Sequence, residues 1–179
     1  MDIPENLPQN YMHCFNFLPI EERKQIDSTL ASFDVVYMIE LGDTVYSFVR
    51  FTINRILMIK AKECIYVDAF KKINDQTWIL VCSSYDDVNY PKIKSHDRMT
   101  IVLGGTLFEN DHEGSGEEGG TKCTKFTLLD PATRIPVKVV KGMMGSYFKT
   151  FYREQAKVLQ KYSGCGADHW KEVIRDKEF

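Results

Sequence analysis

Hydrophobic and polar residues alternate through the middle of the chain in the pattern of β-strands. The strand-like segments are rich in β-branched and aromatic residues, and short polar connections separate them. Gly42 and Asp43 form the first of these connections and are typical of a hairpin turn. We therefore expect an antiparallel meander of at least six strands, at residues 34–41, 44–53, 63–73, 77–85, about 97–108 and 121–129.

Two other segments have the features of helices. The first opens at Pro19, carries Glu21 in its first turn and is expected to end near Phe33. From Ile135 onward, apolar residues recur mostly at intervals of three, four or seven, which predicts one long amphipathic helix. A long C-terminal helix laid across an antiparallel sheet gives an α+β fold. The apolar positions of this helix are Val137, Val140, Met144, Phe148, Phe151, Val158, Leu159 and Tyr162.

The composition fits one globular domain. The chain has 179 residues, of which 44% are hydrophobic and 27% charged, and this is enough apolar material for a sizeable core. The formal net charge of -2 gives no general attraction to phosphate backbones, so nucleic acid is not an expected partner. No stretch approaches the roughly 20 apolar residues that span a bilayer, and we expect a cytoplasmic protein. We divide the chain into a leader (1–18), a folded domain (19–163) and a tail (164–179).

Five strings mark successive elements of the chain: EERKQID, GDTVYSFVRF, KAKECIYV, TWILVCSSY and GTKCTKFTLLDPATRIP. In this order they resemble the START family, the steroidogenic-acute-regulatory-related lipid-transfer domains. The resemblance extends from about Pro19 to Tyr162. It implies a helix-grip fold, in which a curved antiparallel sheet wraps around a long C-terminal helix and encloses a lipid. Within the family, the RKQID part of the first string is nearest to the phosphatidylcholine transfer proteins.

The chain also departs from the family's pattern. Ile26 stands where the family usually has tryptophan, and Lys62 and Glu63 stand where it usually has Arg-Asp. The family's first helix and first strands have no counterpart in the leader. A sheet without those strands has an exposed edge, which a homodimer or a partner strand would cover.

Arg23 and Asp27 lie four positions apart on the predicted first helix, so their side chains share one face. The resemblance implies that they form the lipid headgroup site, with the arginine at the phosphate and the aspartate at the choline end. A guanidinium offers a fixed fork of donors to phosphate oxygens, and a carboxylate balances a quaternary ammonium. The alternative is a surface ion pair worth about 0.3 to 0.5 kcal/mol.

The resemblance further implies a hydrophobic cavity between the sheet and the long helix. For each aromatic residue the alternative is ordinary core packing, because strands favour such side chains in any case. We expect the cavity to be lined by Phe48, Trp78, Leu80, Cys82, Val140, Met144, Tyr147, Phe148 and Phe151.

Two glycines make the first part of the long helix easy to unwind. In a helix interior, Gly142 and Gly145 each cost about 1 kcal/mol relative to alanine. An acyl chain of roughly sixteen carbons loses on the order of 12 kcal/mol of favourable burial in water, so a carrier needs a gate that opens against a membrane. Residues 137–151 are one candidate gate. The alternative is permanent packing, with the glycines allowing close approach.

A second candidate gate precedes the third string. The apolar residues Leu57, Met58 and Ile59 neighbour Lys60 and Lys62, a combination suited to shallow membrane insertion. An ordinary buried strand end is equally consistent with this pattern.

These features predict a carrier that binds a lipid and transfers it between membranes through transient membrane contact. A phospholipid such as phosphatidylcholine is favoured over a sterol. We expect no catalytic residues, no cofactor and no metal, because the four histidines are scattered and no phosphate-loop or metal-ligand motif is present. Two alternatives stay open: a small enzyme of the helix-grip superfamily acting on a hydrophobic ligand, and an interaction module that transfers no lipid.

Overall fold

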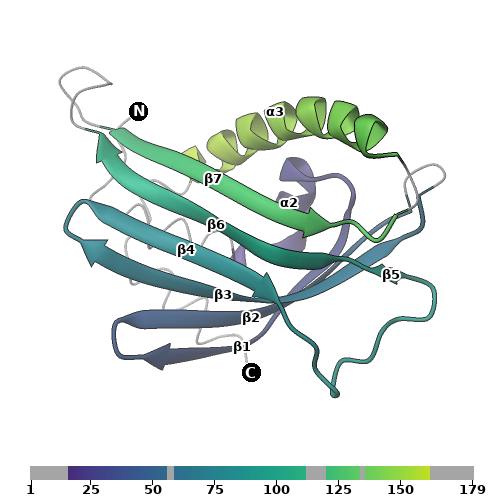
Figure 1. Ribbon diagram of the computed structural model, residues 1–179. Coiled ribbons are helices and arrows are strands. Elements are labelled where there is room, and N and C mark those ends of the chain that lie inside the picture. Colours follow the sequence, from purple (N-terminus) through teal and green to yellow (C-terminus); the bar gives the residue numbers. More distant parts are fainter. Residues whose placement is uncertain (1–15, 56–58, 112–119, 134–135, 162–179) are drawn as a thin grey trace.

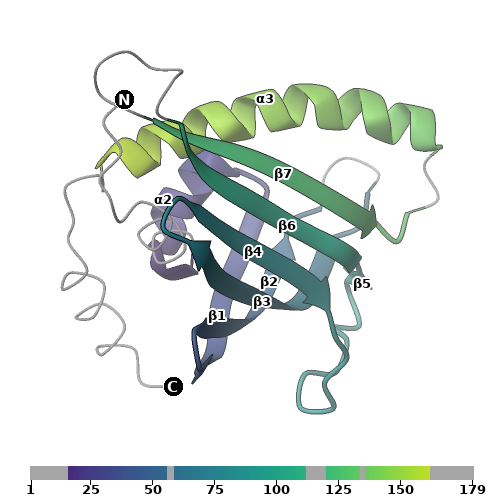
Figure 2. The same cartoon turned by 60° about the vertical axis from the view of Figure 1, so that its left-hand side comes forward.

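The computed structural model describes residues 16–55, 59–111, 120–133 and 136–161. In this part of the chain an antiparallel sheet curves around helix α2, and helix α3 runs alongside strand β7 (Figure 1; Figure 2). The elements in chain order are α2 (Ile20–Ile26), β1 (Leu30–Leu41), β2 (Thr44–Ile53), β3 (Lys62–Asn74), β4 (Thr77–Ser84), β5 (Asp97–Arg98), β6 (Thr100–Asp111), β7 (Gly120–Asp130) and α3 (Val137–Lys161).

The sheet is a meander in which strands that follow each other in the chain lie side by side. Its order is β1-β2-β3-β4-β6-β7, and every pair along this path is antiparallel. The short β5 lies off this path and pairs in parallel with β3. Gly42 has a φ of 64° in the β1–β2 turn, a left-handed conformation that glycine adopts without steric cost. The predicted meander and its first hairpin are confirmed.

The predicted end of the first helix near Phe33 is wrong. Helix α2 stops at Ile26, and Asp27 after it has extended dihedral angles (φ -136°, ψ 94°). The Asp27 carboxylate accepts hydrogen bonds from the backbone N–H of Thr29 at 2.9 Å and from its hydroxyl at 2.6 Å. These bonds stabilise a turn instead of a further helical turn. From Leu30 onward the chain pairs with β2, because its β-branched and aromatic residues fit a strand.

The sheet has two faces, and we call the face that carries Ser47 and Lys125 the inner face. Asn16, just before α2, donates a hydrogen bond to the Ser47 hydroxyl at 3.1 Å. The Lys125 ammonium lies 5.5 Å from the centre of the Phe151 ring of α3. The inner face is therefore the face that the helices cover, and we call the opposite face the outer face.

Apolar packing joins α3 to the segment before α2. Phe17 and Leu18 are buried in one cluster with Val158 of α3. Because Asn16, Phe17 and Leu18 are all buried, the end of the predicted leader is packed with the domain. Three further hydrophobic residues pack against this cluster: Ile26, Val35 and Met38.

Glu63 of β3 is fully buried at the centre of an ion cluster. Its Oε2 lies 3.4 Å from Arg50 Nη2, and its Oε1 lies 3.4 Å from Arg98 Nη2. The same Oε1 accepts a hydrogen bond from the Ile93 N–H at 2.8 Å. One carboxylate thus holds the connection between β4 and β5 against the outer face of the sheet.

Lys62, the residue before this carboxylate, is also buried and satisfied. Its ammonium donates hydrogen bonds to the Asp97 carboxylate at 3.1 Å and to the Ala132 carbonyl at 2.7 Å. The departure from the Arg-Asp pair of the START pattern therefore keeps one cation and one anion at adjacent positions. Each of the two charges has partners within the protein.

We expect Glu63→Ala to lower the free energy of unfolding by about 3 to 5 kcal/mol, because the change leaves two guanidinium groups without their buried counter-charge. Urea denaturation measures this loss. The matched control is Asp75→Ala, which removes an ion pair to Lys72 from a side chain that is 97% exposed and should change stability very little. Equal losses in the two variants would show that the cluster is not a stabilising feature.

Candidate functional site

Arg23 lies inside the domain, on α2. The residue is only 5% exposed, and its Nε donates a hydrogen bond to the Leu18 carbonyl at 3.2 Å. The guanidinium carbon lies 3.5 Å from the centre of the Phe33 ring, where the negative face of the aromatic ring stabilises a cation. An exposed surface ion pair does not describe this residue. The fold instead buries the permanently charged guanidinium of Arg23 inside the domain.

Asp27 is the point at which α2 is tied to α3. Its Oδ1 accepts both hydrogen bonds from Thr29, and its Oδ2 accepts a hydrogen bond from the Tyr147 hydroxyl at 2.6 Å. Burial raises the pKa of Tyr147, and the hydrogen bond to the Asp27 carboxylate raises it further. The phenol therefore stays protonated and remains the donor. Both carboxylate oxygens of Asp27 are engaged within the chain.

The sequence reasoning missed Asp68, which lies on the inner face of β3. The residue is 2% exposed, and its Oδ2 has no hydrogen-bond partner among the described residues. Burial raises the pKa of Asp68 to about 7, although the charges of Lys125 and Arg23 act in the opposite direction. The alternation of side chains along β3 could have identified Asp68, because it shares a face with the buried Tyr66 and Phe70.

Lys125 of β7 completes this group of charges and was also missed. Its ammonium lies 5.5 Å from the Phe151 ring and 6.0 Å from the Tyr152 ring, both on α3. Burial lowers the pKa of Lys125, and the Asp68 carboxylate partly offsets this effect. Water still reaches the side chain, because β7 is a terminal strand of the sheet. The cation therefore stands at the border between protein interior and solvent.

Three of the residues predicted to line a cavity lie together on the inner face. Trp78 and Leu80 of β4 pack with Phe70 and Phe108, and Cys82 follows on the same face, opposite Asp68 in the β3–β4 ladder. Burial raises the pKa of the Cys82 thiol to about 12, so this group is uncharged at neutral pH. The inner face of β4 is therefore apolar from Trp78 to Cys82, which lies opposite Asp68 of β3.

Of the α3 residues predicted to line the cavity, the structure describes the side chains of only two. Tyr147 and Phe151 are half-buried, and their ring centres are 5.9 Å apart. The backbones of Val140, Met144 and Phe148 belong to α3, but their side chains lie outside the described part of the structure.

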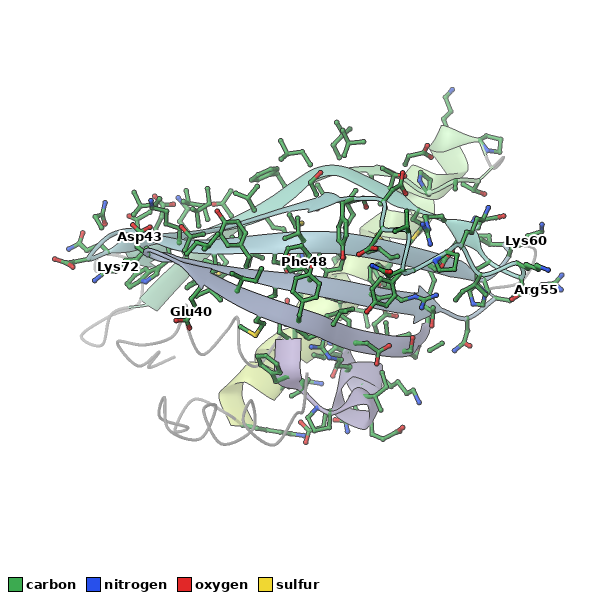
Figure 3. The ribbon with its side chains drawn as sticks, turned by 90° about the horizontal axis from the view of Figure 1, so that it is seen from below. Glu40, Asp43, Phe48, Arg55, Lys60 and Lys72 are labelled. Atoms are coloured by element: carbon green, nitrogen blue, oxygen red, sulfur yellow. The ribbon has the colours of Figure 1, made fainter. Side chains whose placement is uncertain are left out.

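Phe48, expected in the same lining, lies on the outer face. It occupies the middle of the sheet (Figure 3), stacked on Tyr37 with ring centres 4.0 Å apart and edge-on to Tyr85 at 5.6 Å. Side chains alternate along a strand, and the buried Ser47 and Val49 on either side of it take the inward positions of β2. The structure therefore separates Phe48 from Trp78, Leu80 and Cys82.

The predicted gating residues fall into two groups. Leu57 and Met58 lie outside the described residues, and Ile59 is half-buried. Arg55 and Lys60, on either side of this segment, lie at one end of the sheet (Figure 3).

Gly142 and Gly145 form the second group and are exposed in α3. A Cβ atom added at either glycine would meet no described atom within 4 Å. Within the described part of the chain, no closely approaching element explains these glycines.

The described residues contain neither a metal-binding cluster nor a membrane-spanning helix. No three His, Cys, Asp or Glu side chains of that part gather in an arrangement that would hold a metal ion. No helix in it is sufficiently long and apolar to cross a membrane.

Solved structures similar to this chain are StAR-related lipid transfer domains. Human STARD10 matches with a TM-score of 0.67 and 18% identity, over 98% of this chain and 67% of that chain. Human StAR-related lipid transfer protein 5 matches with a TM-score of 0.62 and 17% identity, over 78% of this chain and 64% of that chain. The human StarD13 (DLC2) lipid transfer and protein localization domain matches with a TM-score of 0.59 and 15% identity, over 86% of this chain and 70% of that chain. The chain thus spans about two thirds of these structures. No protein-family model and no curated protein matches the sequence.

The predicted α+β helix-grip fold is confirmed by this likeness. The curved antiparallel sheet and the long C-terminal helix α3 are both present, and STARD10 matches nearly the whole chain. At these sequence identities the comparison shows only that the fold is similar, so function has to be argued from the residues of this chain.

We expect Asp68→Asn to stabilise the protein increasingly as the pH rises. The folded pKa of Asp68 is about 7, against a usual value of 3.8. Between these values the folded chain binds more protons than the unfolded chain, so wild-type stability falls as the pH rises from about 4 to about 7. At about 1.4 kcal/mol per pKa unit, the full penalty above pH 7 has an upper limit of about 4 kcal/mol.

Thermal unfolding from pH 4 to pH 8 measures this effect. The charges that act on Asp68 are those of Lys125 and Arg23, whereas Tyr66 and Cys82, with pKa values raised by burial, stay neutral over this range. Asp43→Asn on the surface is the control. A stability difference between Asp68→Asn and wild type that does not change with pH would contradict the prediction.

Proposed function

We propose that this chain binds a single lipid between the inner face of its sheet and α3, and that it carries the lipid between membranes. The observation that supports this most is the group of charges on the helix-covered side of a sheet with the START-type fold: the buried Arg23 and Asp68, with Lys125 beside them at the solvent border. Proteins of this fold include ones named as lipid transfer proteins. The proposal requires no covalent chemistry.

A phospholipid fits this arrangement better than a sterol. The Arg23 guanidinium is a permanent cation, and its planar set of N–H donors matches the oxygens of a phosphate. The aromatic and aliphatic side chains of β4 and α3, among them Trp78, Leu80 and Phe151, provide apolar contacts for acyl chains. A sterol would bring only one small polar group to a site with several charges.

Asp27 has a further role in this proposal. Since Thr29 and Tyr147 engage both of its oxygens, a headgroup ammonium that reached Oδ2 would weaken the hydrogen bond from the Tyr147 hydroxyl. Headgroup binding and the attachment of α3 would then compete for one carboxylate. This competition couples the occupancy of the site to the position of the helix.

The proposed gate is the first half of α3, assisted by the segment 56–59. An acyl chain of roughly sixteen carbons is held by on the order of 12 kcal/mol of burial, so release requires a membrane against which the gate opens. Gly142 and Gly145 make the helix easier to unwind, and no described atom lies close enough to require a glycine at either position. Arg55 and Lys60 at the end of the sheet (Figure 3) would attract anionic headgroups. On this proposal the protein is cytoplasmic and contacts membranes transiently.

We expect Arg23→Gln to slow the transfer of fluorescent phosphatidylcholine between two vesicle populations by about tenfold to a hundredfold, because hydrogen bonds to charged groups contribute about 1.5 to 3 kcal/mol. The matched control is Lys24→Gln, since this neighbouring lysine forms only an exposed pair with Glu21. Both variants must unfold at temperatures close to that of wild type. Equal transfer by the Arg23→Gln variant and wild type would remove Arg23 from the proposed site.

We expect the double variant Gly142→Ala/Gly145→Ala to raise stability by up to about 2 kcal/mol and to slow transfer, because each alanine stiffens the helix by about 1 kcal/mol. Tyr147→Phe should have the opposite effect on transfer, because it removes the hydrogen bond to Asp27. Stopped-flow transfer and denaturant unfolding measure the two properties, with Lys149→Ala as the control on α3. Faster transfer by the double variant, or an unchanged rate despite higher stability, would rule out α3 as the gate.

A second candidate function is self-association through β7. This strand lies at one end of the described sheet, and its Phe126 and Leu128 are 43% and 61% exposed. A terminal strand with exposed apolar side chains favours pairing with another strand. Sedimentation of the purified protein before the transfer assay distinguishes a dimeric carrier from a monomeric one, and a dimer that transfers no lipid would favour an interaction module.

A further inference from the structure

We infer that Asp68 is the acceptor for the ammonium group of the bound lipid, and that the chain therefore prefers a headgroup ending in a primary ammonium to one ending in a quaternary ammonium. The inference rests on the proposed function and defines which phospholipid the site takes. It assigns a binding role to a residue that the headgroup pair Arg23 and Asp27 does not include.

The first argument is the unsatisfied carboxylate. Asp68 is 2% exposed, and its Oδ2 has no hydrogen-bond partner among the described residues. Its neighbours across the ladders are Ser47 on β2 and Cys82 on β4. The Ser47 hydroxyl accepts a hydrogen bond from Asn16 and makes no hydrogen bond to the Asp68 Oδ2, and a thiol is a weak donor. A buried carboxylate oxygen is costly unless a donor reaches it, so a ligand with a strong donor would gain most here.

The second argument is the arrangement of charges. Two cations, Arg23 of α2 and Lys125 of β7, are near enough to act on the Asp68 carboxyl. A zwitterionic headgroup carries the complementary set, with a phosphate for the two cations and an ammonium for the carboxylate. Asp27 is less suited to the ammonium, because Thr29 and Tyr147 already engage its oxygens.

The third argument separates primary from quaternary ammonium groups. A primary ammonium has three N–H donors for a carboxylate, whereas a quaternary ammonium has none and is bound by aromatic faces. The aromatic stack of Tyr37, Phe48 and Tyr85 lies on the outer face. The aromatic residues that flank Asp68 on the inner face, Tyr66 and Phe70, are themselves buried in apolar clusters. The Asp68 carboxylate is therefore an acceptor that a primary ammonium can satisfy and a quaternary ammonium cannot.

The test is competitive loading of the full chain from vesicles with equal amounts of dioleoyl phosphatidylethanolamine and dioleoyl phosphatidylcholine. The acyl chains are identical, so only the headgroups differ. The experiment is run at pH 8, where Asp68, with a pKa of about 7, is mostly ionised. Bound lipids are extracted from the re-isolated protein and quantified by mass spectrometry.

We expect wild type to take up the ethanolamine lipid in about tenfold excess, since hydrogen bonds to charged groups are the strong ones. Asp68→Asn, which keeps the shape of the side chain, should bring the ratio close to one. Lys125→Met should lower the uptake of both lipids without changing their ratio. Asp43→Asn on the surface should behave like wild type.

The outcomes separate this inference from the proposed function. Uptake of both lipids in equal amounts by wild type would overturn the inference and leave the lipid carrier standing. An ethanolamine preference that persists in Asp68→Asn would also overturn it, because another residue would then select the headgroup. Uptake of neither lipid would overturn the proposed function itself. The wild-type ratio is informative even if the Asp68→Asn variant does not fold.

Discussion

The burial of charged side chains is the constraint on which this structure depends. On the outer face, Glu63 is surrounded by two guanidinium groups and a backbone N–H, so the protein alone compensates its charge. On the inner face, the Asp68 carboxylate faces cations that lower its pKa only in part. A charge taken out of water needs close partners. The same sheet thus carries one buried carboxylate with partners within the protein and one with an oxygen that has no hydrogen-bond partner among the described residues.

The second organising contact is the hydrogen bond between Tyr147 and Asp27. Helix α2 is short, and the carboxylate that ends it also holds α3 in place. Apolar packing of Val158 against Phe17 and Leu18 holds the later part of α3, whereas the earlier part contains Gly142 and Gly145, which lower helix propensity. A helix anchored at one end and soft at the other can move without losing its attachment.

The sequence was sufficient for the antiparallel meander, because β-branched runs and a Gly-Asp turn determine its hairpins locally, and resemblance to the START family then indicated a curved sheet with a long C-terminal helix. The separate parallel strand β5 was not predicted. The end of α2 was not predictable from helical spacing, because strand pairing at Leu30 competes with helix propagation. The face of Phe48 depends on strand register, since a shift of one residue reverses every side chain. Asp68 and Lys125 lie 57 positions apart in the chain, and only the folded sheet brings them to one face.

The order of contacts along the chain also bears on how this protein folds. Each ladder of the sheet, apart from the parallel β3–β5 pair, joins strands that follow one another along its path, so the sheet can form hairpin by hairpin at a low cost in loop entropy. The hydrogen bond from Tyr147 to Asp27 spans 120 positions, so closing the chain at this contact costs more loop entropy than closing one hairpin. Local opening of α3 at this hydrogen bond would leave the paired strands of the sheet intact.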